Sequence, residues 1–334
     1  MSEYYQDKLP LLKKIFGTST VKVAENSLSV QGKHYPIIHD VIVLLEQGHY
    51  TSFVTKELQM TNHTVSHTVH KIATDIQYSF GEEWQNYSDV LIEHQQEFSQ
   101  YFDIVNLDML KQKCVCDLGC GNGRWSFFLK DICQTLILVD FSDAIFAARK
   151  NLTGSSNCLF FMGDLQALPF ADNFADFLFC IGVLHHLPTP CLDEVRKLKR
   201  FAPQLLVFLY YALDNRPIHF QILLHWVTFL RRNLTKIHSP TLRQIVTTIG
   251  TYFFYLPLVY LGYILKPFHL SSHVPLYDFY HDKGVERIKQ DVYDRFFTSI
   301  EQRVARKEIL QLRDTFSTVT ISDKLPYWHF LCER

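Results

Sequence analysis

No cysteine precedes Cys114, and none of the eight cysteines has the paired spacing of a zinc ribbon. Cys114 and Cys116 are separated by one residue within an apolar stretch, which predicts a strand rather than a metal site. The sequence therefore gives no reason to expect a disulfide framework. We expect reduced thiols that pack in the core of a cytoplasmic protein.

The chain also lacks an excess of either charge, with 33 basic and 34 acidic residues and a net charge of -1. A dominant electrostatic attraction to nucleic acid is therefore not expected. The segment 1–10 has no basic stretch followed by an apolar run, so we expect no secretory signal. The sequence contains no internal repeat.

Strand-like and helix-like segments alternate from Cys114 onward. This pattern is typical of a mostly parallel sheet with helices on both faces, an α/β three-layer fold. A charged helix is expected over 300–316, and a closing hairpin would bring the total to seven strands with the last one antiparallel. The expected strands cover 114–118, 136–140, 159–162, 174–180, 205–210, 318–322 and 327–332.

Changes in composition and hydrophobic pattern along the sequence divide the chain into four parts. Residues 1–75 form an accessory module with one clear strand at 27–30, and residues 76–213 form the first part of the α/β core, beginning with a helical stretch over 84–113. Residues 214–285 are an apolar helical insertion, and residues 286–334 complete the core.

A glycine-rich loop, Asp117-Leu118-Gly119-Cys120-Gly121-Asn122-Gly123, follows the first core strand. Glycines at such a place permit a tight turn and close approach of a ligand to the backbone. The dinucleotide-binding fingerprint would require glycine at position 124, which is Arg124. Asp117 adds a carboxylate that suits a ligand with an ammonium and a sulfonium better than a pyrophosphate.

Polar groups also end the next three strands. Asp140 is placed to accept both hydroxyls of a ribose. Asp164 could accept the exocyclic amine of an adenine, and the fourth strand is followed by Val183-Leu184-His185-His186-Leu187. Since open α/β sheets bind ligands at the carboxyl ends of their strands, these four strand ends predict one binding rim.

Four motifs taken together resemble those of the class I methyltransferases that depend on S-adenosylmethionine (SAM). They are DLGCGNG, VD, GD followed by LPF, and VLHHL. The resemblance covers about residues 110–210, and the hairpin at 317–334 also fits. It implies a Rossmann-like fold with SAM as cofactor. It places Asp117, Gly119 and Gly121 against the methionine part, Asp140 at the ribose, and Asp164 and Leu165 beside the adenine. Cys120, Gly123 and Phe141 complete the predicted cofactor-binding set.

Two shorter segments carry further resemblances. Residues 28–40 are similar to half of a zinc-ribbon-like module that often precedes methyltransferases, but its cysteines are absent, so we expect no zinc in residues 1–75. Residues 79–84 resemble a segment that helps to cover the SAM pocket in bacterial methyltransferases acting on sugars or cell-surface compounds. This resemblance implies that Trp84 contacts the cofactor, whereas simple packing is the alternative.

Methyl transfer to a hydroxyl or an amine is helped by a base near the methyl group. His185 and His186 are the candidates at the rim, although one or both could serve only to pack the loop. Three arginines at positions 216, 295 and 303 could bind an acidic acceptor, or could form ion pairs with neighbouring residues.

The insertion contains a charge-free stretch, 245–265, that is long enough to span a bilayer. Crossing the membrane would separate strands of one sheet, so an apolar lid or peripheral membrane contact is the preferred interpretation. Leu223, Val227, Leu230 and Leu234 recur on one face of the preceding segment and favour the same conclusion.

The sequence thus predicts a methyltransferase that acts on an oxygen or nitrogen of a small, lipid-linked or sugar-linked acceptor. The alternatives are a nicotinamide-dependent oxidoreductase and a non-catalytic protein that binds SAM. The acceptor and the oligomeric state do not follow from the sequence.

Overall fold

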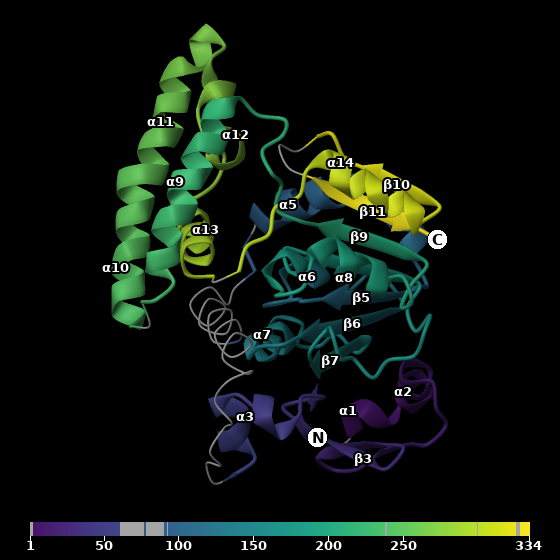
Figure 1. Cartoon of the computed structure of the whole chain (residues 1–334). Helices are drawn as coiled ribbons and strands as arrows, with labels where there is room; N and C mark the ends of the chain where they lie inside the picture. The colour runs from purple at the N-terminus through teal and green to yellow at the C-terminus, as the bar shows by residue number, and fades with distance from the viewer. Residues whose placement is uncertain are drawn as a thin grey trace.

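The computed structural model describes residues 3–60, 77, 90–91, 93–237, 239–298, 300–324 and 328–334. Its centre is a twisted sheet in which the seven predicted core strands lie in the order β7-β6-β5-β8-β9-β11-β10 (Figure 1). Strand β11 is antiparallel to both of its neighbours, β9 and β10, which confirms the predicted antiparallel last strand. The bounds are β5 Cys114–Leu118, β6 Thr135–Asp140, β7 Cys158–Met162, β8 Phe177–Ile181, β9 Gln204–Phe208, β10 Thr318–Ile321 and β11 His329–Glu333.

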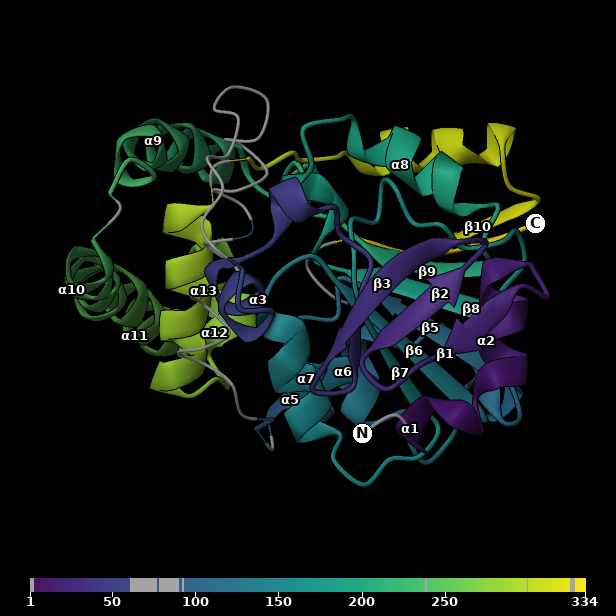
Figure 2. The same ribbon diagram turned by 90° about the horizontal axis from the view of Figure 1, so that it is seen from below.

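The N-terminal segment continues this sheet rather than standing apart from it. Strand β4 (Val41–Val43) pairs in parallel with β7, and β3 (Lys33–Ile38), β2 (Ser27–Val30) and β1 (Val21–Val23) follow as an antiparallel meander. The sheet of the described residues therefore has eleven strands, four more than the sequence predicted. Figure 2 shows the meander at the edge of the sheet, beside α1 (Glu3–Gln6) and α2 (Leu9–Phe16).

Alternate residues of the core strands supply two apolar layers. On β5, Cys116 and Leu118 face a layer covered by α2 and α8 (Cys191–Leu198), whereas Val115 faces the opposite layer. That second layer is covered by α5 (Glu93–Tyr101), α6 (Arg124–Phe127) and α7 (Ala144–Asn151). All eight cysteines are buried and unpaired, as expected for core thiols. The three-layer prediction is thereby confirmed.

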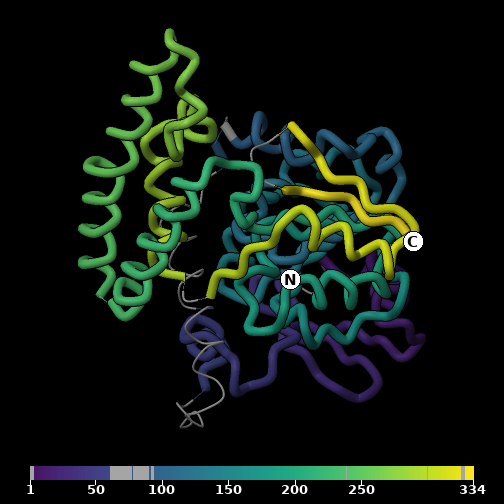
Figure 3. The backbone as a smooth tube through the Cα atoms, turned by 45° about the horizontal axis from the view of Figure 1, so that its top comes forward, coloured from purple at the N-terminus to yellow at the C-terminus, as the bar shows by residue number. Residues whose placement is uncertain are grey.

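The helical insertion stands beside the sheet domain, as the green helices of Figure 3 show. Helix α9 runs over Ile218–Leu234, and α10 (Pro240–Gly250) continues through a π-helical turn, η4 (Thr251–Tyr255), into α11 (Leu256–Leu265). Helix α12 (Tyr277–Tyr280) follows, and α13 (Val285–Phe297) packs against both α9 and α10. The helical part therefore extends to Phe297, past the boundary at 285 that the sequence predicted.

Two other predicted helices are shorter than expected. In the stretch 84–113, the described residues contain α5 and a 3-10 turn, η2 (Leu107–Leu110). In the stretch 300–316, helical structure begins only with α14 (Arg306–Ile309) and η7 (Leu310–Asp314). The prediction over 300–304 was wrong because this segment runs extended along the rim, where Val304 N donates to Tyr210 O at 2.9 Å.

The remaining short elements connect these layers. They are η1 Gln47–His49, α3 Ser52–Glu57, η3 Leu184–His186, η5 Lys266–Phe268 and η6 Ser271–His273.

Candidate active site

The glycine loop leaves the end of β5 in a conformation that glycine adopts easily. Gly119, Gly121 and Gly123 have φ angles of 76°, 54° and 76°. A Cβ atom on Gly119 would lie 2.3 Å from Val183 Cγ2, so any larger residue would collide with the loop after β8. Glycine at position 119 is therefore required by the close approach of Val183.

Asp140, at the end of β6, forms hydrogen bonds both with the glycine loop and with the loop that follows β6. Its Oδ2 accepts from Gly121 N at 2.8 Å, and its Oδ1 accepts from Ser142 N at 2.8 Å and Ser142 Oγ at 2.7 Å. Burial raises the pKa of Asp140, and the hydrogen bonds from Ser142 and Gly121 oppose that shift. Asp140 is therefore held as an acceptor at the rim by groups of both loops.

A cavity of about 970 Å³ opens between this rim and the helical insertion. Its rim side is formed by the loops after β5, β6, β7, β8 and β9, and its other side by α9 to α13. Among the predicted site residues it is lined by Gly119, Cys120, Gly121, Asp140, Phe141, Asp164, Leu165 and His186. The structure therefore brings eight of the predicted residues together around one space.

Asp117, Gly123 and His185 do not line this cavity, and Trp84 lies outside the described residues. Gly123 is instead the residue before α6, and a Cβ atom there would lie 3.1 Å from Ala148 Cβ. Its role is close packing of the loop on α7, so the geometry does not support the predicted contact with a cofactor.

Asp117 is 1% exposed and its Oδ2 accepts a 2.7 Å hydrogen bond from Ser126 Oγ on α6. Burial raises the pKa of Asp117 to about 8, more than the bond from Ser126 lowers it. The residue therefore joins β5 to α6 beneath the glycine loop, in place of the predicted direct contact with a ligand.

Stability is expected to depend on pH through Asp117. An aspartate in an unfolded chain titrates near pH ~4, so between about pH 4 and 8 the folded protein holds a proton that the unfolded chain has lost. This contribution to stability is full below pH ~4 and is lost as the pH rises to about 8. Urea unfolding of Asp117→Asn should show a smaller fall in the free energy of unfolding between these limits than the wild type. An equal fall in both proteins would contradict the assignment.

The two adjacent histidines have different surroundings. His185 is fully buried and stacks on Tyr210 with ring centroids 3.9 Å apart. Neither of its ring nitrogens has a hydrogen-bond partner among the described residues. Burial holds the pKa of His185 well below its ordinary value, so the ring is neutral. His186 lines the cavity, and its Nδ1 lies 2.8 Å from Ile300 O. In the neutral tautomer that donates this bond, Nε2 is an acceptor.

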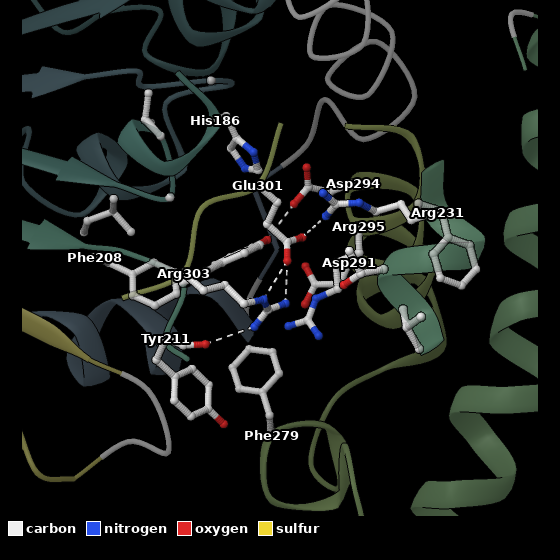
Figure 4. A pocket seen from close by; sticks show the side chains of 18 of the residues that line it. His186, Phe208, Tyr211, Arg231, Phe279, Asp291, Asp294, Arg295, Glu301 and Arg303 are labelled. Carbon is white, nitrogen blue, oxygen red and sulfur yellow. Dashed lines mark hydrogen bonds and ion pairs between the residues drawn. The ribbon is translucent and has the colours of Figure 1, made fainter. Parts of the chain in front are cut away.

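A cluster of charged side chains lies deeper in the cavity (Figure 4). Glu301 forms an ion pair with Arg231 of α9 and accepts from Arg303 Nε at 2.7 Å. Burial raises the pKa of Glu301, but Arg303 and Arg231 outweigh burial and hold the pKa below its ordinary value. Arg303 also donates to Tyr211 O at 3.1 Å.

Of the three arginines considered from the sequence, two already have partners. Arg216 forms a 2.6 Å ion pair with Asp278, and Arg303 is held by Glu301. None of the ion pairs among the described residues involves Arg295, and its buried Nε has no hydrogen-bond partner there. Arg295 instead lies 5.7 and 5.9 Å from the ring centroids of Tyr210 and Tyr280, and its charge helps to lower the pKa of Asp291.

Sequence reasoning missed Tyr210 and Arg231. Tyr210 follows the end of β9, so its place at the carboxyl end of a parallel strand was a usable signal. Its hydroxyl donates to Asp294 Oδ2 at 2.8 Å. Arg231 gave no local signal because its partner Glu301 is 70 positions away.

Residues 115–201 match the family model described as a methyltransferase domain. A protein of Encephalitozoon cuniculi named as a methyltransferase is 30% identical over 110 residues, which are 30% of this chain and 46% of that protein. The tRNA U34 carboxymethyltransferase of Aliarcobacter butzleri is 36% identical over 84 residues, which are 24% of this chain and 28% of that protein. The matches span less than half the length of these curated relatives.

A SAM-dependent methyltransferase from Aquifex aeolicus, known from its crystal structure, is 19% identical. The similarity covers 39% of this chain and 73% of that one, with a TM-score of 0.33. The family match covers β5 to α8, including the glycine loop, Asp140 and Asp164. The chain therefore contains a class I SAM-dependent methyltransferase domain.

Proposed function

We propose that this protein transfers a methyl group from SAM to an oxygen or nitrogen of a small, lipid-linked or sugar-linked acceptor. The observation that carries this proposal is the single cavity that joins the glycine loop and Asp140 to His186 and the charged cluster. A cofactor at the rim and an acceptor among the helices would thus share one enclosed space. Proximity of the two reactants and exclusion of water are what methyl transfer requires.

The rim residues fit the shape and polarity of SAM. The backbone at Gly119 and Gly121 would cradle the methionine part, and the Asp140 carboxylate, which lines the cavity, would accept from the ribose. Asp164 lines the cavity and its Oδ1 already accepts from Gln166 N at 2.9 Å, so Oδ2 is placed to take the adenine amine. SAM supplies a methyl group made electrophilic by its sulfonium.

His186 is the proposed base. The acceptor oxygen or nitrogen attacks the methyl carbon as the carbon–sulfur bond breaks, and the acceptor proton passes to His186 Nε2. S-adenosylhomocysteine is the leaving product. The bond between Nδ1 and Ile300 O fixes the ring orientation. His185 has no such role because it is buried behind Tyr210.

His186→Gln is expected to lower kcat by about 100- to 10,000-fold, the usual contribution of a positioned base. SAM affinity should change little, because His186 is proposed to contact the acceptor and not the methionine, ribose or adenine of SAM. Single-turnover transfer of a labelled methyl group would measure the rate, and calorimetry would measure the affinity. A normal rate with the variant would mean that the acceptor loses its proton by another route.

We further propose that the acceptor carries an acidic group that binds Arg295. This guanidinium lines the cavity, and its charge helps to lower the pKa of Asp291, but it forms no ion pair with a carboxylate of the described residues. A buried cation gains most from an anionic ligand. The cavity around it is largely apolar, with Leu224, Val227 and Leu258 among its lining residues. An acceptor with both an acidic group and an apolar portion fits this environment best.

Arg295→Met should raise KM for the acceptor by about 10- to 150-fold, the loss of about 1.5–3 kcal/mol for a hydrogen bond to a charged group. The assay would follow label from SAM into the acidic fraction of a cell extract. Arg313→Met, which removes an exposed arginine of η7, is the matched control and should behave like the wild type. Equal KM values for both variants would rule out the Arg295 subsite.

One experiment tests the proposed function as a whole. Purified protein is incubated with methyl-labelled SAM and a small-molecule extract, and the labelled product is isolated. Transfer of label separates a methyltransferase from a non-catalytic protein that binds SAM. Binding of a nicotinamide cofactor in place of SAM would support the oxidoreductase alternative, which Arg124 and the family match both disfavour.

A further inference from the structure

The helices that line the cavity also carry a second apolar surface that faces away from it. We define this outer apolar face by Ile222, Trp226 and Phe229 on α9, Phe253 and Ile264 on η4 and α11, and Phe268 on η5. These six side chains are between 54% and 73% exposed, and none of them lines the cavity. Apolar side chains gathered in this way on one part of a protein mark an interaction site.

The inner side of the same helices is already packed against the chain. Cβ atoms on Gly250 and Gly262 would lie 2.9 Å from Phe296 and 2.1 Å from Tyr277, so the backbones approach closely there. Tyr255 and Val259 are buried in the same cluster. The inner side of these helices is therefore closely packed, and the outer apolar face is a separate surface.

The charge of the insertion indicates what the outer face binds. The stretch 215–277 contains no aspartate or glutamate, but it contains six arginines and lysines. Arg216 and Arg231 pair with residues outside this stretch, whereas Arg232, Lys236 and Lys266 are exposed. Exposed apolar side chains on a stretch whose only charged residues are arginines and lysines are complementary to the surface of an anionic bilayer.

One helix of the described residues, Pro240–Phe268, is long and apolar enough to cross a membrane by length and composition. Of its most apolar stretch, 33% is buried inside the protein. Its contacts with α13 hold it beside the segment that leads into β10 and β11 of the sheet. Docking parallel to the surface keeps these contacts, whereas spanning would break them.

We propose that the outer apolar face docks on an anionic lipid bilayer, with Arg232, Lys236 and Lys266 against the headgroups. Figure 1 shows α9, α10 and α11 standing beside the sheet. Residues of the same helices line the cavity, so docking places the cavity next to the lipid phase. Vesicle binding needs neither SAM nor an acceptor. A failure to bind would therefore refute the docking surface and leave the proposed methyl transfer untouched.

The test is flotation of the full chain with vesicles of phosphatidylcholine alone or mixed with phosphatidylglycerol. We expect strong binding to the mixed vesicles that weakens at high salt, and much weaker binding to phosphatidylcholine alone. Replacing Arg232 and Lys236 by glutamine should weaken binding about 25-fold, from about fivefold for each basic residue. Phe253→Ser with Ile264→Ser should weaken it at least about 100-fold, because two large apolar side chains no longer leave water.

Met109→Ser is the matched control, since Met109 is 63% exposed on η2, outside the insertion, and its loss should not change flotation. Circular dichroism confirms that each variant is folded. Absence of flotation with either vesicle, or equal loss with the control variant, would overturn the proposal. So would a stable homodimer in lipid-free solution that Phe253→Ser with Ile264→Ser dissociates, because the face would then be covered by a second copy.

Discussion

Replacing Asp140 by alanine is expected to weaken SAM binding by about 10- to 150-fold, corresponding to about 1.5–3 kcal/mol for a charge-assisted hydrogen bond. The carboxylate has two roles at the rim. It would accept a ribose hydroxyl, and it fixes the glycine loop through the 2.8 Å bond from Gly121 N. The substitution therefore removes a ligand contact and also loosens the loop that would cradle the methionine part.

Isothermal titration calorimetry with SAM and S-adenosylhomocysteine would measure the effect. Asp131→Ala is the matched control, because the Asp131 side chain is 87% exposed and lies at the opposite end of the strands. We expect the control to bind like the wild type. Unchanged SAM affinity in a folded Asp140→Ala protein would remove Asp140 from the cofactor site.

Replacing Arg287 by methionine is expected to destabilise the protein by about 3–5 kcal/mol, the usual cost of removing one partner of a buried ion pair. Arg287, on α13, donates through Nε and Nη2 to both carboxylate oxygens of Glu97 on α5, at 3.0 and 3.2 Å. The two residues are 4% and 0% exposed. Their pair joins the helical insertion to the methyltransferase core, and its loss would leave the Glu97 carboxylate buried without a guanidinium.

Urea unfolding would measure the destabilisation. Arg287 also forms an ion pair with Asp291, which keeps a hydrogen bond from Tyr280. The double variant Arg287→Met with Glu97→Leu should therefore recover only part of the lost stability, the part due to the Glu97 carboxylate. Lys289→Met lies on the same helix and removes only an ion pair with the exposed Glu286, so it should cost less than about 1 kcal/mol. A similar cost for Arg287→Met and Lys289→Met would show that the Arg287 pair does not hold the insertion in place.

Local sequence patterns determined most of the core. The bounds predicted for β5 agree with the structure, because a short apolar run before a glycine loop leaves little choice of secondary structure. The conformation of the loop also followed from sequence, since Gly119 and Gly121 adopt positive φ angles that other residues avoid. The gathering of four strand ends at one rim followed from the parallel alternation alone.

Tertiary structure decided which of the polar residues reach the cavity. Asp117 and Asp140 both occur near strand ends, but α6 covers Asp117 and supplies Ser126 as its partner. His185 and His186 are adjacent and both are buried in the 3-10 turn η3, yet only His186 lines the cavity. A pattern of apolar residues predicts the elements, but not which side chains a neighbouring element will cover.

Contacts between distant parts of the chain could not be predicted from the sequence either. Strand β4 extends the sheet by pairing with β7, whose residues are more than 100 positions away. The segment 300–304 is extended because its backbone bonds to the rim, with Gln302 N donating to His185 O at 2.8 Å. Local propensity predicted a helix there. The hydrogen bonds to a distant strand end replaced those that a helix would have formed within the segment.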